Sequence, residues 1–383
     1  MTSLKRIFAA LACLAASATA TATANTLLTP PVPEIAARAY LLTDYYSGQT
    51  LAQRDENMRV EPASLTKLMT AYVTFKAVKQ GRIKLDQVVP VSSNAYKKEG
   101  SVMFIDPKIP VTVDELIHGM IIQSGNDACI ALAEAIAGSE AVFAQMMNQE
   151  AARLGMKNTH FVNSTGLPDP QHYTTAHDLA LIAAALVRDF PEFYPIYSQK
   201  EFTYNKIKQP NRNLLLYRDP NVDGMKTGHT ESAGFCLIAS SKRDGRRVIS
   251  VVLGTTGDNV RATESSKLLN WGLQFYDTPK LYSANQSLQQ VPVWKGAERE
   301  IKVGFRNDLY LSLPKGTASR IKASLTTQQP LLAPVAAGQR VGKLTLTLDG
   351  QPLGEYPVVA LNNVAQAGIF GRAWDSVRLM FNK

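Results

Sequence analysis

Ser64 and Lys67 are the residues of this sequence whose types and spacing most directly suggest chemistry. Residues at positions i and i+3 share one face of a helix, so the Ser64 hydroxyl and the Lys67 amine are predicted to lie side by side. A serine hydroxyl is a weak nucleophile until a base takes its proton, and a buried, unprotonated lysine can be that base. The pair therefore indicates nucleophilic catalysis through a covalent intermediate.

The context of the pair separates it from two other copies of the same spacing. Pro62 precedes it as at a helix entry, and a helix ending near Gly81 is predicted. Ser-x-x-Lys also occurs at Ser312–Lys315 and Ser319–Lys322, but these copies fall among predicted turns and strands. Apolar residues at helical spacing would hold the first copy in a core: Leu65, Leu68, Met69, Tyr72 and Val73.

Ser124 and Asn126 form a second polar pair, on a predicted break between two helices. The first of these helices opens with a capping box, in which Thr112 is the N-cap and Glu115 follows three residues later. On such a tight loop both polar side chains can point into a cleft. The alternative is that Ser124 and Asn126 only cap the second helix.

Lys226-Thr227-Gly228 is a third motif, and it precedes a strand-like run. Asp244-Gly245 is a hairpin signal that turns this run into a further strand. The motif is predicted to lie on an edge strand beside the cleft, where Gly228 leaves room for a substrate backbone. The alternative is an ordinary turn between strands.

The N-terminus has the pattern of a secretory signal peptide. Lys5 and Arg6 precede the apolar run 7–18, and Ala22-Thr23-Ala24 is a small-x-small cleavage site. The alternative, an uncleaved anchor, is disfavoured because the run is too short to span a membrane. We therefore expect residues 1–24 to be removed and the mature protein to work outside the cytoplasm.

Composition narrows the class of protein further. The chain has 383 residues, 45% of them hydrophobic, and a net charge of +9 that falls to +7 without Lys5 and Arg6. Export and the lack of a clustered basic stripe argue against a nucleic-acid partner. Cys129 and Cys236 have apolar neighbours and are predicted to be buried free thiols. No His/Cys cluster has metal-ligand spacing, so no metal is expected.

The chain changes texture near Thr278, where short alternating strands begin, including 309–313 and 343–348. These predict a small all-β domain over residues 278–364. Residues 365–383 predict an amphipathic, membrane-associating helix, with Leu379 as an exception on its polar face. The alternative is a helix docked on the protein's own core. Its expected apolar face carries Ile369, Phe370, Ala373, Trp374, Val377, Met380 and Phe381.

The three motifs occur in order, with 60 residues from Ser64 to Ser124 and 102 from Ser124 to Lys226. Together they form the set found in class A β-lactamases and penicillin-binding proteins. The chain resembles the low-molecular-mass penicillin-binding proteins that are D-alanyl-D-alanine carboxypeptidases, serine peptidase family S11. The resemblance implies an α/β (α+β) transpeptidase/β-lactamase-like domain, an antiparallel sheet flanked by helices, over residues 25–277.

The resemblance also implies a role for each site residue, and the reaction that it implies needs no cofactor. Ser64 would attack the carbonyl between two terminal D-alanines of a peptidoglycan stem peptide, and Lys67 would take its proton. Ser124 and Lys226 would relay a proton to the departing amine, and Asn126 would bind the substrate backbone. The N–H groups of Ser64 and His229 would form the oxyanion hole. The substrate carboxylate would meet Lys226, Thr227 and Arg261, with Arg212 as a further candidate on the cleft wall.

Several alternative functions compete with that of a D-alanyl-D-alanine carboxypeptidase. A class A β-lactamase would need a glutamate for deacylation, and no glutamate occurs between Glu150 and Glu192. A DD-endopeptidase shares the three motifs, and a non-catalytic wall-binding scaffold is the alternative from another class. The expected partners are the stem peptide, β-lactam antibiotics as covalent inhibitors, and a membrane surface. The expected location is the periplasmic face of the cytoplasmic membrane.

Overall fold

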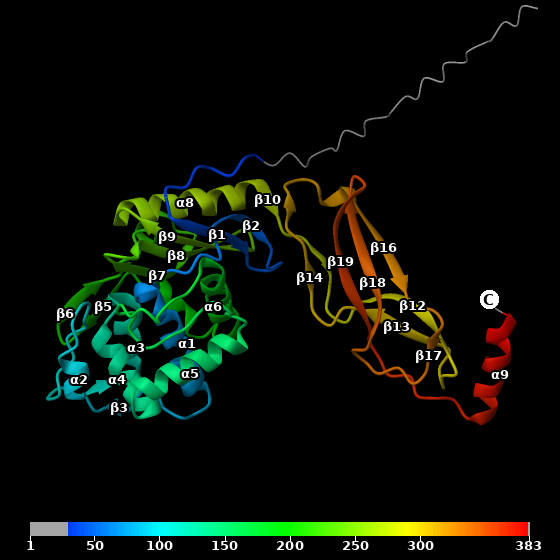
Figure 1. Ribbon diagram of the computed structural model, residues 1–383, viewed down its shortest axis with the longest axis horizontal. Coiled ribbons are helices and arrows are strands. Elements are labelled where there is room, and N and C mark those ends of the chain that lie inside the picture. Colours follow the sequence, from blue (N-terminus) through cyan, green and yellow to red (C-terminus); the bar gives the residue numbers. More distant parts are fainter. Residues whose placement is uncertain (1–29, 382–383) are drawn as a thin grey trace, which may run out of the picture.

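The computed structural model of the chain describes residues 30–381 (Figure 1). The predicted signal peptide therefore lies outside the described residues.

A five-stranded antiparallel sheet, in the order β2-β1-β9-β8-β7, forms the centre of the first part of the chain. The hairpin between β8 and β9 turns at Asp244 and Gly245, both with positive φ, as the Asp-Gly signal predicted. β7 lies at an edge of the sheet, which confirms the predicted position of the Lys-Thr-Gly motif. The strands are β1 (Ala39–Asp44), β2 (Thr50–Arg54), β7 (Val222–Thr230), β8 (Gly234–Arg243) and β9 (Arg246–Thr255).

Helices cover both faces of this sheet, with α8 (Asp258–Phe275) on one face and most of the others on the opposite face (Figure 1). Successive strand residues point to opposite faces, so Leu41 packs in the core under the helical layer and Leu42 in the core under α8. The other helices are α1 (Lys67–Lys79), α2 (Ser93–Tyr96), α3 (Val113–His118), α4 (Asn126–Ala137), α5 (Glu140–Arg153), α6 (Ala176–Asp189) and α7 (Leu215–Arg218).

Short elements complete this part of the chain. Two small two-stranded sheets pair β3 with β4 and β5 with β6. The short helical turns are η1 (Ala63–Thr66), η2 (Gly119–Gln123) and η3 (Tyr194–Ser198), and the short strands are β3 (Val88–Val89), β4 (Val111–Thr112), β5 (Glu201–Tyr204) and β6 (Ile207–Pro210).

The C-terminal part is a β domain with its own buried core, as predicted. Its largest sheet has the strand order β16-β18-β19-β13-β12-β17. Asp349 and Gly350, again with positive φ, form the turn between β18 and β19. The strands of this sheet are β12 (Ser287–Trp294), β13 (Glu300–Gly304), β16 (Ile321–Thr327), β17 (Leu331–Leu332), β18 (Arg340–Leu348) and β19 (Gln351–Ala360). The short helical turn η4 (Ala318–Arg320) precedes β16.

The strand predicted over 309–313 is instead two separate pieces, β14 (Leu309–Tyr310) and β15 (Leu313–Pro314). They pair with β11 (Lys280–Tyr282) and β10 (Tyr276–Asp277), respectively. The strand is interrupted at Ser312, whose N–H donates to Gln49 Oε1 over 2.5 Å and whose hydroxyl bonds that of Ser47 over 2.6 Å. The junction with the first part of the chain therefore bends this segment.

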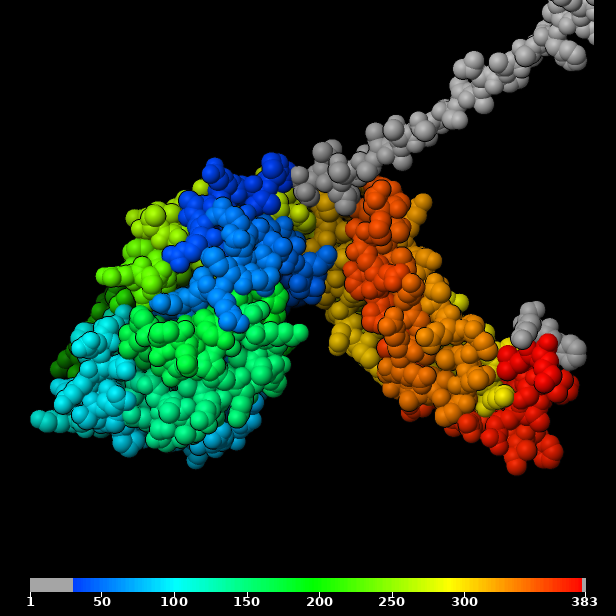
Figure 2. All heavy atoms as spheres, in the orientation of Figure 1, coloured from blue at the N-terminus to red at the C-terminus, as the bar shows by residue number. Residues whose placement is uncertain are grey.

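The predicted C-terminal helix is α9 (Ile369–Phe381), at the end of the β domain far from the central sheet (Figures 1 and 2). Its polar side touches the β domain, where the Lys295 N–H donates to Asp375 Oδ2 over 2.6 Å and Arg378 lies 5.8 Å from the Trp294 ring. Its apolar side faces outward, with exposed fractions of 74% at Ile369, 93% at Phe370, 64% at Trp374, 48% at Val377 and 76% at Met380. The alternative in which the apolar face docks on the protein's own core is therefore wrong for these residues.

Within residues 30–381, no single helix is long and apolar enough to cross a membrane. The helices α4 and α5 meet that test only as a pair, and they are bent by 84° relative to each other.

Candidate active site

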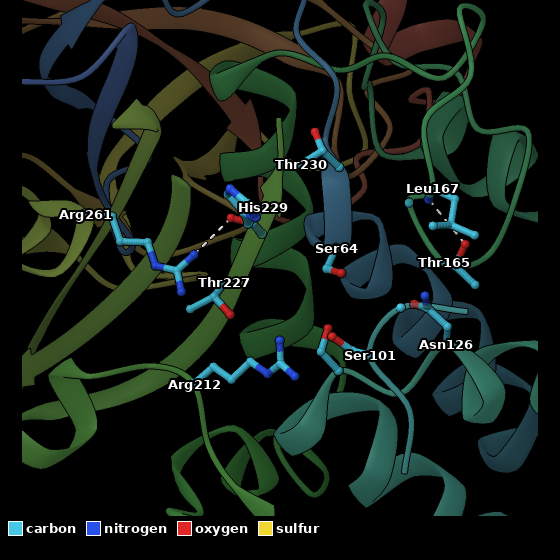
Figure 3. A pocket seen from close by; sticks show the side chains of 14 residues that line it. Ser64, Ser101, Asn126, Thr165, Leu167, Arg212, Thr227, His229, Thr230 and Arg261 are labelled. Atoms are coloured by element: carbon cyan, nitrogen blue, oxygen red, sulfur yellow. Dashed lines mark hydrogen bonds between the residues drawn. The ribbon is translucent and has the colours of Figure 1, made fainter. Parts of the chain in front are cut away.

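A polar cleft lies between the edge strand β7 and the N-terminal end of the Ser64 segment, with a cavity volume of about 210 Å³ (Figure 3). Eight of the ten residues proposed from the sequence line it, and the other two, Lys67 and Lys226, lie buried beneath it. The eight are Ser64, Ser124, Asn126, Arg212, Thr227, Gly228, His229 and Arg261.

The Ser64–Lys67 pair is formed as predicted, although the backbone differs in detail. Ser64 lies in the 3₁₀ turn η1, and the α-helix begins only at Lys67. The Lys67 Nζ lies 2.9 Å from the Ser64 Oγ, 2.8 Å from the Asn126 Oδ1 and 2.7 Å from the Thr165 carbonyl oxygen. Lys67 is only 1% exposed, so these three oxygens replace water around its amine.

This arrangement directs the proton between Lys67 and Ser64. A neutral amine has two N–H donors and one lone pair, whereas the Thr165 carbonyl and the Asn126 Oδ1 can only accept. When Lys67 is neutral, both donors are used on these two acceptors, and the lone pair is left for the Ser64 O–H. The neutral amine is therefore oriented to receive the serine proton.

Burial also makes the neutral form of Lys67 easier to reach near neutral pH. It lowers the pKa of Lys67 to about 8, because the low-polarity surroundings disfavour the ammonium form. The pKa of Lys226 is lowered well below its ordinary value, first by burial and then by the positive charges of Lys67, Arg212 and Arg261. The cleft thus holds two lysines that lose protons more readily than an exposed lysine.

Ser124 faces the cleft because of the way its helix ends. After α3 the chain passes through the π-helical turn η2, and Ser124 takes a left-handed conformation with φ of 68°. Its hydroxyl accepts a hydrogen bond from Lys226 Nζ over 3.0 Å, and that Nζ also donates to the Thr227 carbonyl over 3.1 Å. The next helix has Gly125 as its N-cap and no side-chain cap, so the capping interpretation of Ser124 is wrong.

Asn126 is held by protein partners on both ends of its amide. Its Oδ1 accepts from Lys67, and its Nδ2 donates to the Glu99 carbonyl over 2.7 Å. The neighbouring Asp127, only 2% exposed, accepts backbone N–H bonds from Met103, Phe104, Ile105 and Ala128. This carboxylate ties the loop that carries Gly100 and Ser101, on the cleft rim, to the start of α4.

The packing gives a further reason for a glycine at position 228, beside the predicted room for a substrate backbone. A Cβ at Gly228 would lie 3.1 Å from Leu65 Cγ and 3.2 Å from the Pro62 carbonyl oxygen. The missing side chain therefore lets β7 approach the Ser64 segment closely, which brings Thr227 and His229 to the same cleft as Ser64 (Figure 3).

The two arginines of the cleft differ in how they are held. The Arg261 Nη1 donates to the Gly228 carbonyl over 3.0 Å and to the Cys236 carbonyl over 3.3 Å, and its guanidinium pairs with Asp258. Arg212 is exposed, points into the cleft and has no ion pair or side-chain hydrogen bond within residues 30–381 (Figure 3). Arg212 is thus the arginine with free donors, and Arg261 braces β7.

The loop over 159–175 is a part of the site that sequence reasoning missed. It presents the Thr165 carbonyl to Lys67, and the Asn163 side chain shapes its turn by accepting the Gly166 N–H over 2.7 Å. His172, only 2% exposed, pins it to η1 through a 2.8 Å bond between its Nε2 and the Thr66 Oγ1. Asn163 and Gly166 are ordinary turn signals, but a backbone carbonyl that contacts a lysine leaves no sequence signature.

Cys129 and Cys236 are buried free thiols, as predicted. Burial raises the pKa of both thiols, so neither is poised as a thiolate nucleophile.

The sequence of the chain matches two protein-family models and is similar to that of characterised relatives. Residues 24–257 match the family model described as D-alanyl-D-alanine carboxypeptidase, and residues 276–366 match the C-terminal domain of penicillin-binding protein 5. The chain is 43% identical over 363 residues to the D-alanyl-D-alanine carboxypeptidase DacC of Escherichia coli, covering 93% of this chain and 91% of that protein.

Two solved structures of penicillin-binding proteins are similar in fold to this chain. Penicillin-binding protein 5 from Haemophilus influenzae aligns with a TM-score of 0.86 and 42% identity, over 88% of this chain and 100% of that one. The ampicillin-bound form of penicillin-binding protein D2 from Listeria monocytogenes aligns with a TM-score of 0.59 and 31% identity, over 63% of this chain and 99% of that one. The chain belongs to the D-alanyl-D-alanine carboxypeptidase family of serine peptidases and is a penicillin-binding protein.

Proposed function

We propose that this serine D-Ala-D-Ala carboxypeptidase acts through an acyl-enzyme on Ser64. The Ser64 Oγ attacks the carbonyl carbon of the penultimate D-alanine while Lys67 takes the hydroxyl proton. The oxyanion that forms is stabilised by the N–H groups of Ser64 and His229. The observation that carries the proposal is the 2.9 Å contact between the Lys67 Nζ and the Ser64 Oγ.

The second half of the reaction uses Ser124 and Lys226. As the C–N bond breaks, the leaving D-alanine amine takes a proton through the Ser124 hydroxyl, which the Lys226 Nζ contacts over 3.0 Å. Water then attacks the Ser64 ester and releases the shortened peptide together with the regenerated serine. Among residues 30–381, no glutamate or aspartate lines the cleft, whose charged lining residues are Arg212 and Arg261. Deacylation is therefore assigned to Lys67 and Lys226, which lie beneath the cleft, and not to a glutamate.

Substrate recognition rests on charge and on free donors. The terminal carboxylate of the substrate is assigned to Thr227, Arg212 and Lys226, since fixed cationic and hydroxyl donors suit a carboxylate. Arg261 contributes by holding β7 in place through the Gly228 carbonyl. Asn126 keeps a role in binding the substrate backbone, next to its contact with Lys67.

The experiment that tests these roles combines two measurements. D-Alanine release from a pentapeptide ending in D-Ala-D-Ala is expected for the wild-type protein and is lost in Ser64→Ala. Intact-mass spectrometry after penicillin treatment, followed by peptide mapping, is expected to place one adduct on Ser64. An adduct on another serine, or none on the folded protein, would contradict the proposal.

We also propose that the exported chain divides into a catalytic domain over 25–277, a β domain over 278–364 and a membrane-associating tail over 365–383. The separate buried cores support the first boundary. The exposed apolar side of α9 supports attachment to the periplasmic face of the cytoplasmic membrane. The second candidate function is a DD-endopeptidase activity. An assay that finds release of D-alanine from the pentapeptide but no cleavage of cross-linked peptide dimers would exclude it.

A further inference from the structure

Arg212 is the central residue of a side-chain-closed turn. The Oδ1 of Asn211 accepts a hydrogen bond from the N–H of Asn213 over 2.9 Å, which closes an Asx turn around the arginine. The two asparagines are 6% and 1% exposed, whereas Arg212 between them is exposed to the cleft. Two buried polar side chains thus flank one free cationic side chain.

Asn211 anchors the first half of this turn. Its backbone N–H donates to the Lys200 carbonyl over 2.7 Å, and its Nδ2 donates to the Gln199 carbonyl over 2.9 Å. These two bonds fix the turn to the residues that precede the β5–β6 hairpin. The Asn211 end of the turn is therefore held independently of β7.

Asn213 links the second half of the turn to the strand that carries Lys226 and Thr227. Its Oδ1 accepts the Leu215 N–H over 3.1 Å, which makes a second Asx turn. Its Nδ2 donates to the Gly224 carbonyl on β7 over 3.1 Å. Gly224 precedes Lys226 by two residues in the chain.

Within residues 30–381, the Arg212 side chain makes no hydrogen bond or ion pair that could fix it. Its charge acts on Lys67, Lys226 and Arg261, and all three interactions are repulsive. Without an anion in the cleft, the position of the guanidinium is therefore set only by the position of the Arg212 backbone. A long side chain must also be ordered when it binds, and a fixed origin reduces that cost.

We propose that Asn213 is a positioning residue, which sets the distance between Arg212 and the pair Lys226–Thr227 so that all three close on one substrate carboxylate. The inference rests on the proposed role of Arg212. The bond from Asn213 to Gly224 makes the turn and β7 one unit, so the guanidinium and the Thr227 hydroxyl approach the carboxylate together.

A double-mutant cycle tests this assignment. The variants of the full chain are Asn213→Ser, Arg212→Ala and the double variant. Serine keeps a hydroxyl for the Leu215 N–H but is too short for the Gly224 carbonyl. In Asn213→Ser we expect kcat/KM for a D-Ala-D-Ala pentapeptide to fall about tenfold, mainly through KM, the factor expected for one lost hydrogen bond. In the Arg212→Ala background the same substitution should change kcat/KM less than about twofold, because its effect passes through the arginine.

Asn148→Ser is the matched control. Asn148 also bonds backbone groups of the catalytic domain, donating to the Phe161 carbonyl over 2.7 Å and accepting its N–H over 2.8 Å. Whatever it costs in activity or melting temperature, that cost should be the same with and without Arg212. A pentapeptide whose terminal carboxylate is replaced by an amide should remove the effects of Arg212→Ala and Asn213→Ser together.

The outcomes separate the inference from the function on which it rests. An equal loss from Asn213→Ser in both backgrounds would mean that Asn213 acts on β7 alone and would overturn the inference. An Arg212→Ala variant with unchanged kcat/KM would remove Arg212 from carboxylate binding and would overturn the proposed role itself. Penicillin labelling of Ser64 in each variant reports separately whether the nucleophile is intact.

Discussion

The Thr165 carbonyl oxygen accepts a hydrogen bond from the Lys67 Nζ over 2.7 Å, although the two residues are 98 positions apart in the chain. Together with Asn126, this carbonyl occupies the donors of a neutral Lys67 and leaves its lone pair for Ser64. In the proposed mechanism, the loop over 159–175 therefore contributes to catalysis through its backbone.

Acylation should depend on pH through Lys67. The pKa of Lys67 is about 8, and the neutral form is the proposed base, so the acylation rate should rise with pH and level off above about pH 8. Well below that pH the rate should fall about tenfold per pH unit, because the neutral fraction does. Stopped-flow acylation by a chromogenic β-lactam between pH 5 and 10 measures the profile.

Lys67→Arg is the control for this profile. Arginine keeps the positive charge but does not deprotonate in proteins, so acylation should be lost at every pH. A variant that still acylates at a rate near that of the wild type would show that another group takes the Ser64 proton.

Gly166→Ala should displace the Thr165 carbonyl. Gly166 has φ of +87°, and an added Cβ would lie 1.8 Å from the Ala63 carbonyl oxygen and 2.9 Å from the Thr66 Oγ1. The loop must move away from η1, and we expect acylation to slow by about tenfold or more, since small misplacements of reacting groups are costly.

Gly138→Ala is the matched control for that substitution. Gly138 also has positive φ, of +77°, but an added Cβ there would meet nothing within 4 Å. It should cost about 1 kcal/mol of stability from backbone strain and leave the acylation rate unchanged. Equal effects of the two substitutions on acylation would show that the Thr165 loop does not set the rate.

His172 should make the stability of the protein depend on pH. Val162 N–H donates to the His172 Nδ1 over 3.1 Å, so the Nε2 carries the hydrogen that reaches Thr66, and the ring is neutral. Burial lowers the pKa of His172 from 6.5 to about 4, so between these values the unfolded chain binds the proton more readily. This stability is fully present above about pH 6.5 and is lost as the pH falls to about 4, by roughly 3 kcal/mol in total.

Urea unfolding at pH 7 and pH 4.5 checks this expectation in the wild type and in His172→Gln. Glutamine can bond both neighbours but does not titrate between these values, so the variant should lose less stability on acidification. If both proteins lose the same free energy of unfolding, carboxylates and not His172 carry the acid sensitivity.

The sequence predicted those parts of the site whose geometry follows from local periodicity. The i and i+3 spacing placed Ser64 beside Lys67, and hairpin signals placed Lys226 on an edge strand. It did not predict which arginine is free, because Arg261 is occupied by backbone carbonyls that only the folded chain brings near. The contact of Thr165 with Lys67 was missed for the same reason, since any residue type can supply a carbonyl.

The same limit explains the errors outside the cleft. The run over 309–313 alternates like one strand, but the contacts of Ser312 with Ser47 and Gln49 break it in two. Within the cleft, the close packing of Gly228 against Pro62 and Leu65 was likewise not predicted. Each error concerns a contact between segments that are distant in sequence.

The last prediction concerns α9 and the membrane. Its outward side exposes Ile369, Phe370, Trp374, Val377 and Met380, and burying one large apolar side chain fully contributes about 1.5–3 kcal/mol. Basic residues near an anionic surface add about 1 kcal/mol each, and α9 carries Arg372 and Arg378. Because these contributions act only at a lipid surface, full-length protein should co-sediment with anionic liposomes, and a chain truncated after Val364 should stay in the supernatant.

Two variants separate the apolar side of α9 from the rest of the tail. Phe370→Ser with Trp374→Ser keeps the helix length and charge, and it should reduce liposome binding nearly as far as the truncation does. Asp375→Asn keeps the apolar side and should bind at least as tightly as the wild type does, since it weakens the contact with the Lys295 N–H and removes one negative charge. The truncated chain and both variants should release D-alanine from a soluble pentapeptide at the wild-type rate, because no residue of the cleft is altered. Equal co-sedimentation of full-length and truncated protein would show instead that the membrane is not what the apolar side of α9 contacts.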